Sequence, residues 1–105
     1  GGGVMGNRSH NIFTAIGSAA DIERLRAQFM VEEAPAVAAG GLLELHFDQL
    51  GLDDGPTYLL GDRISKEFPS LALSCEYHPE GSNWALQGVT EWHAGKRWRE
   101  IMVPT

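Results

Sequence analysis

Residues 68–92 of this chain read FPSLALSCEYHPEGSNWALQGVTEW, and this stretch decides the fold. Along residues 71–77, large apolar side chains alternate with small or polar ones, which is typical of a strand with one buried face. Residues 79–83 then supply the proline, glycine and asparagine of a turn. The alternation resumes along residues 84–92. The stretch therefore predicts a hairpin, and a hairpin needs helices or further strands to be stable in water.

Four further elements are predicted before the hairpin. Ser9–Ile16 and Leu42–Leu50 have the pattern of strands, a helix begins at the capping residue Ser18, and a second helix begins near Pro56. Residues 32–41 contain a proline and several small residues, and they are expected to form a loop. Each helix carries an apolar stripe, made of Ile22, Leu25 and Phe29 in the first helix and of Leu60, Ile64 and Phe68 in the second.

These elements predict an α+β domain of the order β-α-β-α-β-β, with a possible fifth strand at residues 97–103. Two helices on one face of a mostly antiparallel sheet of four or five strands would give a two-layer sandwich. Residues 1–8 are expected to be a flexible, glycine-rich N-terminus. Residues 9–105 are expected to be a single domain, because no linker divides them.

The composition is that of an ordinary globular protein, with 43% hydrophobic and 21% charged residues among 105. Cys75 is the only cysteine, so an internal disulfide is excluded. Together with the lack of an apolar secretory segment, this favours a cytoplasmic protein. No apolar run reaches the roughly 18 residues of a membrane span, and no phosphate-binding glycine motif or other cofactor motif is present.

The charge is distributed unevenly along the chain. The formal net charge is −6 and the sequence pI is about 5.0, which disfavours non-specific binding of nucleic acid. Residues 96–105, however, hold Lys96, Arg97 and Arg99 against Glu100. This basic end is either a contact surface or a solvated edge strand whose charges discourage aggregation, and the second interpretation is favoured.

Two parts of the sequence carry a family resemblance. Residues 11–17 read NIFTAIG, and a later series of features comprises Phe68-Pro69-Ser70-Leu71, Glu76-Tyr77, Pro79, Gly81, Trp84, Ala85 and Gly88. Their order resembles the ferredoxin-like domain of Api-type proteins, which are small bacterial, phage and mobile-element proteins of unknown function. The resemblance covers most of residues 9–95. It implies a ferredoxin-like fold and an origin in bacteria, phages or mobile elements, and it carries over no catalytic residue.

Two segments depart from the family's pattern. Residues 52–56 read LDDGP where the family has a stretch similar to Trp-Ser-Pro-Pro, and residues 92–98 have no clear counterpart.

Several reactive side chains are candidates for a site. The four histidines, His10, His46, His78 and His93, lack the spacing of metal ligands, so scattered surface positions are favoured over a metal site. Cys75 would need His46 or His78 as a base to act as a nucleophile. Because Cys75 shares the apolar parity of its strand, a packed thiol is favoured.

Three glutamates, Glu44, Glu76 and Glu91, have polar strand parities and could gather on one sheet face. Paired carboxylates can perform acid–base chemistry when their environments separate their pKa values. A solvated acidic surface is the favoured interpretation.

The tryptophans and arginines near the C-terminus form the most informative group. Trp and Arg are enriched where proteins bind one another. The predicted interaction surface comprises Trp92, Lys96, Arg97, Trp98 and Arg99. Trp84 and Trp92 could instead simply cover the sheet.

The sequence thus predicts a small acidic binding module, with a protein partner or a second copy of the chain as its ligand. One alternative is a mobile-element inhibitor that offers carboxylates to the basic surfaces of a host nucleic-acid-binding defence complex. Another is a small enzyme with a carboxylate and histidine site over the sheet. RNA binding on the sheet is disfavoured by the acidic charge.

Overall fold

The computed structural model of the chain describes residues 9–51, 58–79 and 86–104. These residues form two helices and one six-stranded antiparallel sheet. Three sequence predictions fall outside them: the flexible segment 1–8, the helix start at Pro56, and the turn beyond Pro79 together with Trp84 at the start of the next strand.

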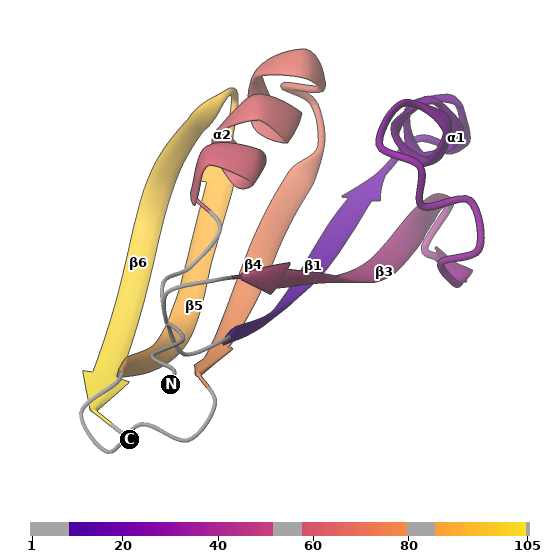
Figure 1. The fold of residues 1–105 in the computed structure, drawn as a ribbon. Coiled ribbons are helices and arrows are strands. Elements are labelled where there is room, and N and C mark those ends of the chain that lie inside the picture. Colours follow the sequence, from indigo (N-terminus) through magenta and orange to yellow (C-terminus); the bar gives the residue numbers. More distant parts are fainter. Residues whose placement is uncertain (1–8, 52–57, 80–85, 105) are drawn as a thin grey trace.

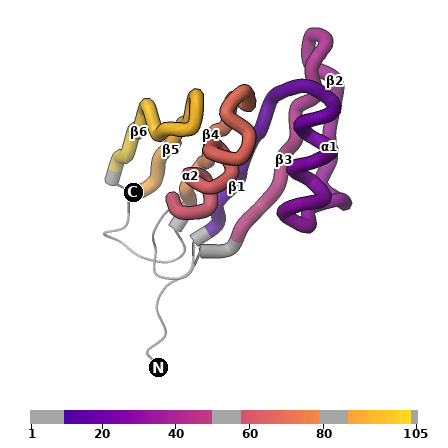
Figure 2. The backbone as a smooth tube through the Cα atoms, turned by 90° about the horizontal axis from the view of Figure 1, so that it is seen from above, coloured from indigo at the N-terminus to yellow at the C-terminus, as the bar shows by residue number. Residues whose placement is uncertain are grey.

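The elements follow one another as β1 (Ser9–Gly17), α1 (Ala19–Gln28), β2 (Ala36–Ala39), β3 (Leu42–Gly51), α2 (Tyr58–Glu67), β4 (Ala72–Pro79), β5 (Leu86–His93) and β6 (Lys96–Pro104). The sheet order is β2-β3-β1-β4-β5-β6. One edge strand is β6 (Figure 1), and the other is β2, which is labelled in Figure 2. β1 lies in the interior and pairs antiparallel with both β3 and β4.

The predicted ferredoxin-like sandwich of four or five strands with the order β-α-β-α-β-β is wrong. The observed order is β-α-β-β-α-β-β-β, and the sheet has six strands. The missed strand is β2, which lies inside the expected loop 32–41 and pairs with the start of β3. Gly40 and Gly41 connect the two strands with φ of 57° and 86°, which is the backbone of a tight two-residue hairpin turn.

Both helices pack on the same face of the sheet (Figure 2). α1 begins at Ser18, whose hydroxyl oxygen accepts a hydrogen bond of 3.2 Å from the backbone N–H of Asp21. The predicted apolar stripes are confirmed at Ile22, Leu25, Ile64 and Phe68, which are all buried, while Phe29 and Leu60 are partly buried. Beneath them the sheet contributes Phe13, Ala15, Leu45, Phe47, Leu73, Cys75 and Trp92, and Leu71 joins the core from the segment just before β4.

Aromatic rings form the centre of this core. Phe13 on β1 stacks on Phe47 of β3 with 5.1 Å between ring centroids, and its ring lies 6.1 Å from that of Trp92 on β5. The indole Nε1 of Trp92 donates a hydrogen bond of 2.7 Å to Asp62 on α2. A Cβ at Gly61 would lie 2.1 Å from the Trp92 ring, so α2 approaches the sheet this closely only because residue 61 is glycine.

The C-terminal hairpin contains a register irregularity between β5 and β6. The β5–β6 register shifts at Glu91/Trp92, so that Glu91 pairs with Arg99 and Trp92 pairs with Arg97. The shift brings Arg99, rather than Trp98, opposite Glu91. Trp92 points toward the helices, while Trp98 lines a pocket on the opposite face of the sheet. At Gly88 the strands are so close that an added Cβ would lie 1.9 Å from the carbonyl oxygen of Ile101.

The sheet surface that points away from the two helices is called the open face. No described helix covers it, because α1 and α2 both contribute to the core on the other side. Its side chains are mixed: Ile12, Thr14 and Ile16 run along β1, between polar residues on β3 and β4. Neither described helix is long and apolar enough to cross a membrane.

Candidate interaction surfaces

The structure divides the predicted interaction surface between the core and two faces of the sheet. Trp92 is only 1% exposed, so it belongs to the core and cannot contact a partner. Trp98 is 61% exposed and lies on the open face. Arg97 points to the helix side, where it meets α2, and Arg99 points to the open face, where it meets Glu91. Lys96 is exposed at the start of β6.

Arg97 is held by two groups of α2. Its Nε lies 3.2 Å from Oδ1 of Asp62, and its guanidinium carbon lies 4.7 Å from the centre of the Tyr58 ring. Burial, followed by the hydrogen bond and the negative charge of Glu100, raises the pKa of Tyr58 to about 12. Tyr58, Arg97 and Glu100 therefore form a small polar cluster that ties β6 to α2.

Arg99 also has a partner within the chain. Its Nε lies 3.6 Å from Oε1 of Glu91 on the adjacent strand, and its guanidinium carbon lies 6.0 Å from the centre of the Trp98 ring. Both arginines of β6 are thus matched by a carboxylate. The basic character that the sequence suggests for this end is therefore largely compensated by neighbouring groups.

Apolar side chains remain exposed on β6. Ile101 is 47% and Val103 is 45% exposed, and Ile101 pairs with Val89 of β5. Because β6 is the last strand of the sheet, one side of its backbone has no neighbouring strand among the described residues. The name β6 edge is used for this strand side together with the exposed Trp98, Ile101 and Val103.

Trp98 forms one wall of a shallow pocket of about 450 Å³ on the open face. The floor comes from Ile16 on β1 and Ala72 on β4, and Thr14 and Glu91 add polar groups. The pocket extends the apolar surface of the β6 edge toward the middle of the sheet.

The four histidines all lie on the open face, because each neighbours a buried residue on its strand. They come from four strands, and only His10 and His78 are direct cross-strand neighbours. His46 is held by Glu44, with 3.0 Å between Nε2 and Oε1, and by the Thr14 hydroxyl at 3.3 Å from Nδ1. Within the described residues, no three His, Cys, Asp or Glu side chains lie close enough to hold a metal ion.

Cys75 lies on the helix side of the sheet and is 1% exposed. Its thiol donates to Oδ1 of Asn11, with 3.7 Å between sulfur and oxygen. His46 and His78, the two histidines considered as its base, are on the open face. The sheet therefore separates the thiol from both imidazoles.

The three glutamates considered for acid–base work share the open face but lie on different strands, Glu44 on β3, Glu76 on β4 and Glu91 on β5. Glu44 pairs with His46, and Glu91 pairs with Arg99. The pocket beside Trp98 contains only Glu91 of this group. A site with two converging carboxylates is not formed there.

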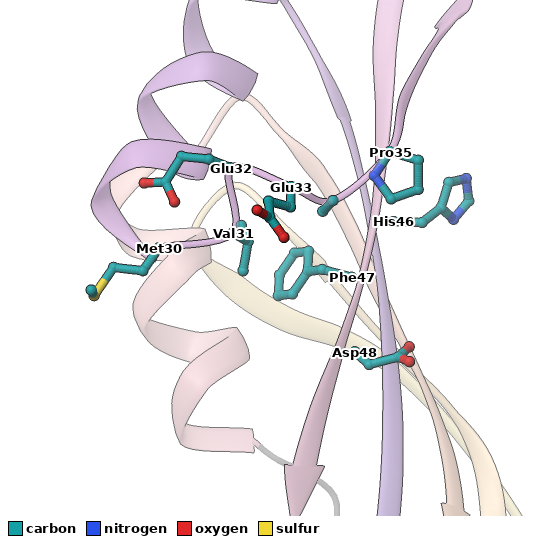
Figure 3. Close-up of a pocket in the computed structure, with 9 residues that line it drawn as sticks. Met30, Val31, Glu32, Glu33, Pro35, His46, Phe47 and Asp48 are labelled. Atoms are coloured by element: carbon teal, nitrogen blue, oxygen red, sulfur yellow. The ribbon is translucent and has the colours of Figure 1, made fainter.

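A second pocket, which the sequence did not indicate, lies at the opposite end of the sheet. It has a volume of about 610 Å³ and is lined by the α1–β2 connector Met30–Pro35 and by His46, Phe47 and Asp48 of β3. Figure 3 shows Phe47 and Glu33 on one side of β3, and the side chains of His46 and Asp48 on the other. This pocket is called the β3 groove.

The β3 groove exists because two paired strands differ in length. β3 has ten residues and β2 has four, and their pairing ends at Ala36 and Leu45. One more hydrogen bond joins the N–H of His46 to the carbonyl of Pro35 at 3.2 Å. Beyond it the connector turns toward α1, so no described strand covers the outer side of β3 from Phe47 to Gly51.

Comparison of the chain with models of known families, with curated proteins and with solved structures finds no match. The resemblance to Api-type domains therefore stays a prediction.

Proposed function

We propose that the protein is a non-enzymatic binding module that forms a homodimer by pairing the β6 edges of two copies. The observation that carries this proposal is the nine-residue edge strand β6 with three exposed large apolar side chains, Trp98, Ile101 and Val103. A long edge strand presents a row of backbone donors and acceptors, and an apolar one is a template for a further strand. Edge-to-edge pairing satisfies the backbone groups and covers the apolar side chains together.

The arginines of β6 are paired with carboxylates of the same chain, and this favours a second copy of the chain as the partner of the β6 edge. Two identical basic strips would repel each other, but Arg97 and Arg99 each face a carboxylate of their own chain. Exposed ion pairs contribute little stability, yet they reduce the charge that one β6 presents to another. What remains for recognition is the backbone and the apolar surface.

A two-fold axis through the strand pair gives a compatible register. If Ile101 lies opposite its symmetry mate, antiparallel pairing places Arg99 opposite Val103 and Glu100 opposite Met102. No like charges then face each other directly, and like charges are what destabilise cross-strand pairs. The two sheets would join into one continuous sheet, with the Trp98 side chains on its open face. Because the contact is narrow, we expect a weak, concentration-dependent dimer.

Sedimentation equilibrium over a wide range of protein concentration tests this proposal. The wild-type chain should approach the dimer mass as concentration rises, and Ile101→Lys should remain a monomer. Val37→Lys is the matched control, because Val37 is 52% exposed and lies on β2, the other edge strand. A wild-type chain that stays monomeric throughout, or an equal loss of dimer in both variants, would contradict the proposal.

A second candidate function is an inhibitor that offers carboxylates to a basic, nucleic-acid-binding complex. Its support is the position of Glu32, Glu33 and Asp48, which are exposed around the β3 groove and have no basic partner among the described residues. Such a surface would attract a positively charged protein, most strongly at low salt. Added protein should then release nucleic acid from the complex. Unchanged nucleic-acid binding at low salt would count against this function.

A further inference from the structure

We infer that the β3 groove binds an extended basic segment of a partner protein, which adds to the sheet as a strand beside the second half of β3. The site is separate from the β6 edge and lies at the other end of the sheet. The inference does not require the homodimer. It rests on the exposed backbone of β3, on the shape of the pocket and on the carboxylates around it.

The backbone of β3 is oriented to accept such a strand. The N–H of His46 points to the outer side, because it donates to the carbonyl of Pro35. Backbone groups alternate in direction along a strand, so the N–H and C=O of Asp48 face the same outer side. No described strand pairs with them there. An added segment of about five residues would match the length from Phe47 to Gly51.

The two sides of β3 specify which side chains the added strand should carry. On the helix side, the groove offers the Phe47 ring edge with Val31 and Ala34, so a small apolar residue fits there. On the open face, the neighbouring side chain is Asp48, and its carboxylate is exposed (Figure 3). Because side chains of a strand alternate between faces, a segment with alternating basic and apolar residues satisfies both sides.

The charge around the groove also favours a basic segment. Glu32, Glu33 and Asp48 contribute three carboxylates, and the salt bridges of the described residues engage none of them. Arg26 reaches this connector, but its guanidinium bonds to the backbone carbonyl of Glu32 and to the Glu23 side chain. An acidic segment would meet like charges on both walls, whereas lysine or arginine would find partners.

A defined peptide tests the inference with the intact protein. The probe is Lys-Val-Lys-Val-Lys with blocked termini and short Gly-Ser flanks. Its control is the same peptide N-methylated at all five residues, which keeps the charge but removes the backbone donors in either strand orientation. Binding is followed by backbone NMR shifts and by amide hydrogen exchange. We expect shifts at residues 46–50, slower exchange of the Asp48 amide, and affinity for the control lower by about tenfold or more.

Two sets of protein variants separate the contributions of backbone and charge. Asp48→Pro removes the outward N–H without removing a donor that faces β1, and it should weaken the probe by about tenfold. Glu33→Gln with Asp48→Asn keeps the backbone and should weaken the probe at low salt only. Ile101→Lys should bind the probe like the wild type, so failure of the dimer and failure of this site give different results.

Three outcomes would overturn the inference: no binding of the probe, equal binding of both peptides, or shifts confined to β6. Circular dichroism first establishes that Asp48→Pro is folded. Should that variant unfold, the comparison of the two peptides on the wild-type protein decides the question alone.

Discussion

The two ends of the sheet present the same kind of backbone with opposite side-chain chemistry. At one end, β6 is a complete nine-residue strand with exposed apolar residues, and its arginines have carboxylate partners. At the other end, β2 covers fewer than half of the residues of β3, and the uncovered part is surrounded by carboxylates without basic partners in the described chain. The difference teaches that an open edge selects its partner by the side chains beside it: an apolar edge suits its own copy, and an acidic edge suits a basic strand.

The two ends are also supported differently from below. The β6 end is anchored by Trp92, which is buried under α2 and bonded to Asp62. At the β3 groove, Val31 and Ala34 of the connector pack against the core and are only partly buried. Met30 of the same connector is 82% exposed and has a φ of 59°. Local opening is easier where fewer apolar groups are buried. We therefore expect the β6 end to be the more rigid of the two.

Among the substitutions considered, Trp92→Ala should cause the largest loss of stability, and the loss should be concentrated at the β6 end. Trp92→Ala removes the central indole of the β6 end and should lower the free energy of unfolding by about 3–5 kcal/mol. Amide exchange should accelerate in β5 and β6 more than in β2. Val31→Ala, beneath the other end, should cost about 1 kcal/mol. Chemical denaturation measures both values, and equal losses would contradict the difference in anchoring.

Gly88→Ala should disturb the β6 edge and leave the β3 groove unchanged. The new methyl group would overlap the carbonyl of Ile101, so β6 must move away from β5, at a cost of about 1–3 kcal/mol. The dimer should weaken in sedimentation experiments, while the basic peptide should still bind the β3 groove. Gln87→Ala, at an exposed neighbouring position, is the control and should change neither. Loss of peptide binding in Gly88→Ala would show that the two ends are coupled.

Two substitutions of Asp62 can separate the stability contributed by its hydrogen bond to Trp92 from that contributed by its ion pair to Arg97. Asp62→Ala leaves the indole N–H without its acceptor and should cost about 1–2 kcal/mol. Asp62→Asn keeps an acceptor oxygen and loses only the charge, so it should cost less than about 1 kcal/mol. Thermal melts of the two variants provide the measurement. Indistinguishable melting temperatures would mean that the hydrogen bond to Trp92 is not what anchors β6.

The smallest expected effect is a pH dependence at Tyr58. Its pKa is raised from 10.0 to about 12 in the folded chain, so the folded state keeps a proton that the unfolded state loses first. Stability from this group is present below pH 10 and declines as pH rises from about 10 to 12. Tyr58→Phe should flatten this part of the stability curve relative to the wild type. Parallel curves for the two proteins would contradict the assignment.

Helical periodicity and strand alternation allowed much of the covered face to be predicted, because Ile22, Leu25, Ile64 and Phe68 occur at spacings that leave one buried stripe. β2 was missed because its four residues contain three alanines and follow Pro35, which indicates a loop. The signal that could have revealed it is Gly40-Gly41, a pair suited to a two-residue hairpin turn.

The candidate surfaces were less predictable than the core. Strand alternation places Trp92 and Trp98 on opposite faces, but only the register shift at Glu91/Trp92 puts Arg99, rather than Trp98, opposite Glu91. The β3 groove depends on the difference in length between two strands, and one of the two, β2, was not predicted. The carboxylate partners of Arg97 and Arg99 come from α2 and β5, so compensation of the basic end required the tertiary structure.

The burial of Cys75 makes its thiol a probe of how the core opens. It is the only thiol among 105 residues and is sealed between the sheet and the helices. An alkylating reagent can reach its sulfur only while those two layers are apart, so at low reagent concentration the rate of alkylation follows the fraction of molecules that are open. At a reagent concentration high enough that alkylation outpaces reclosing, the same side chain reports the rate of opening.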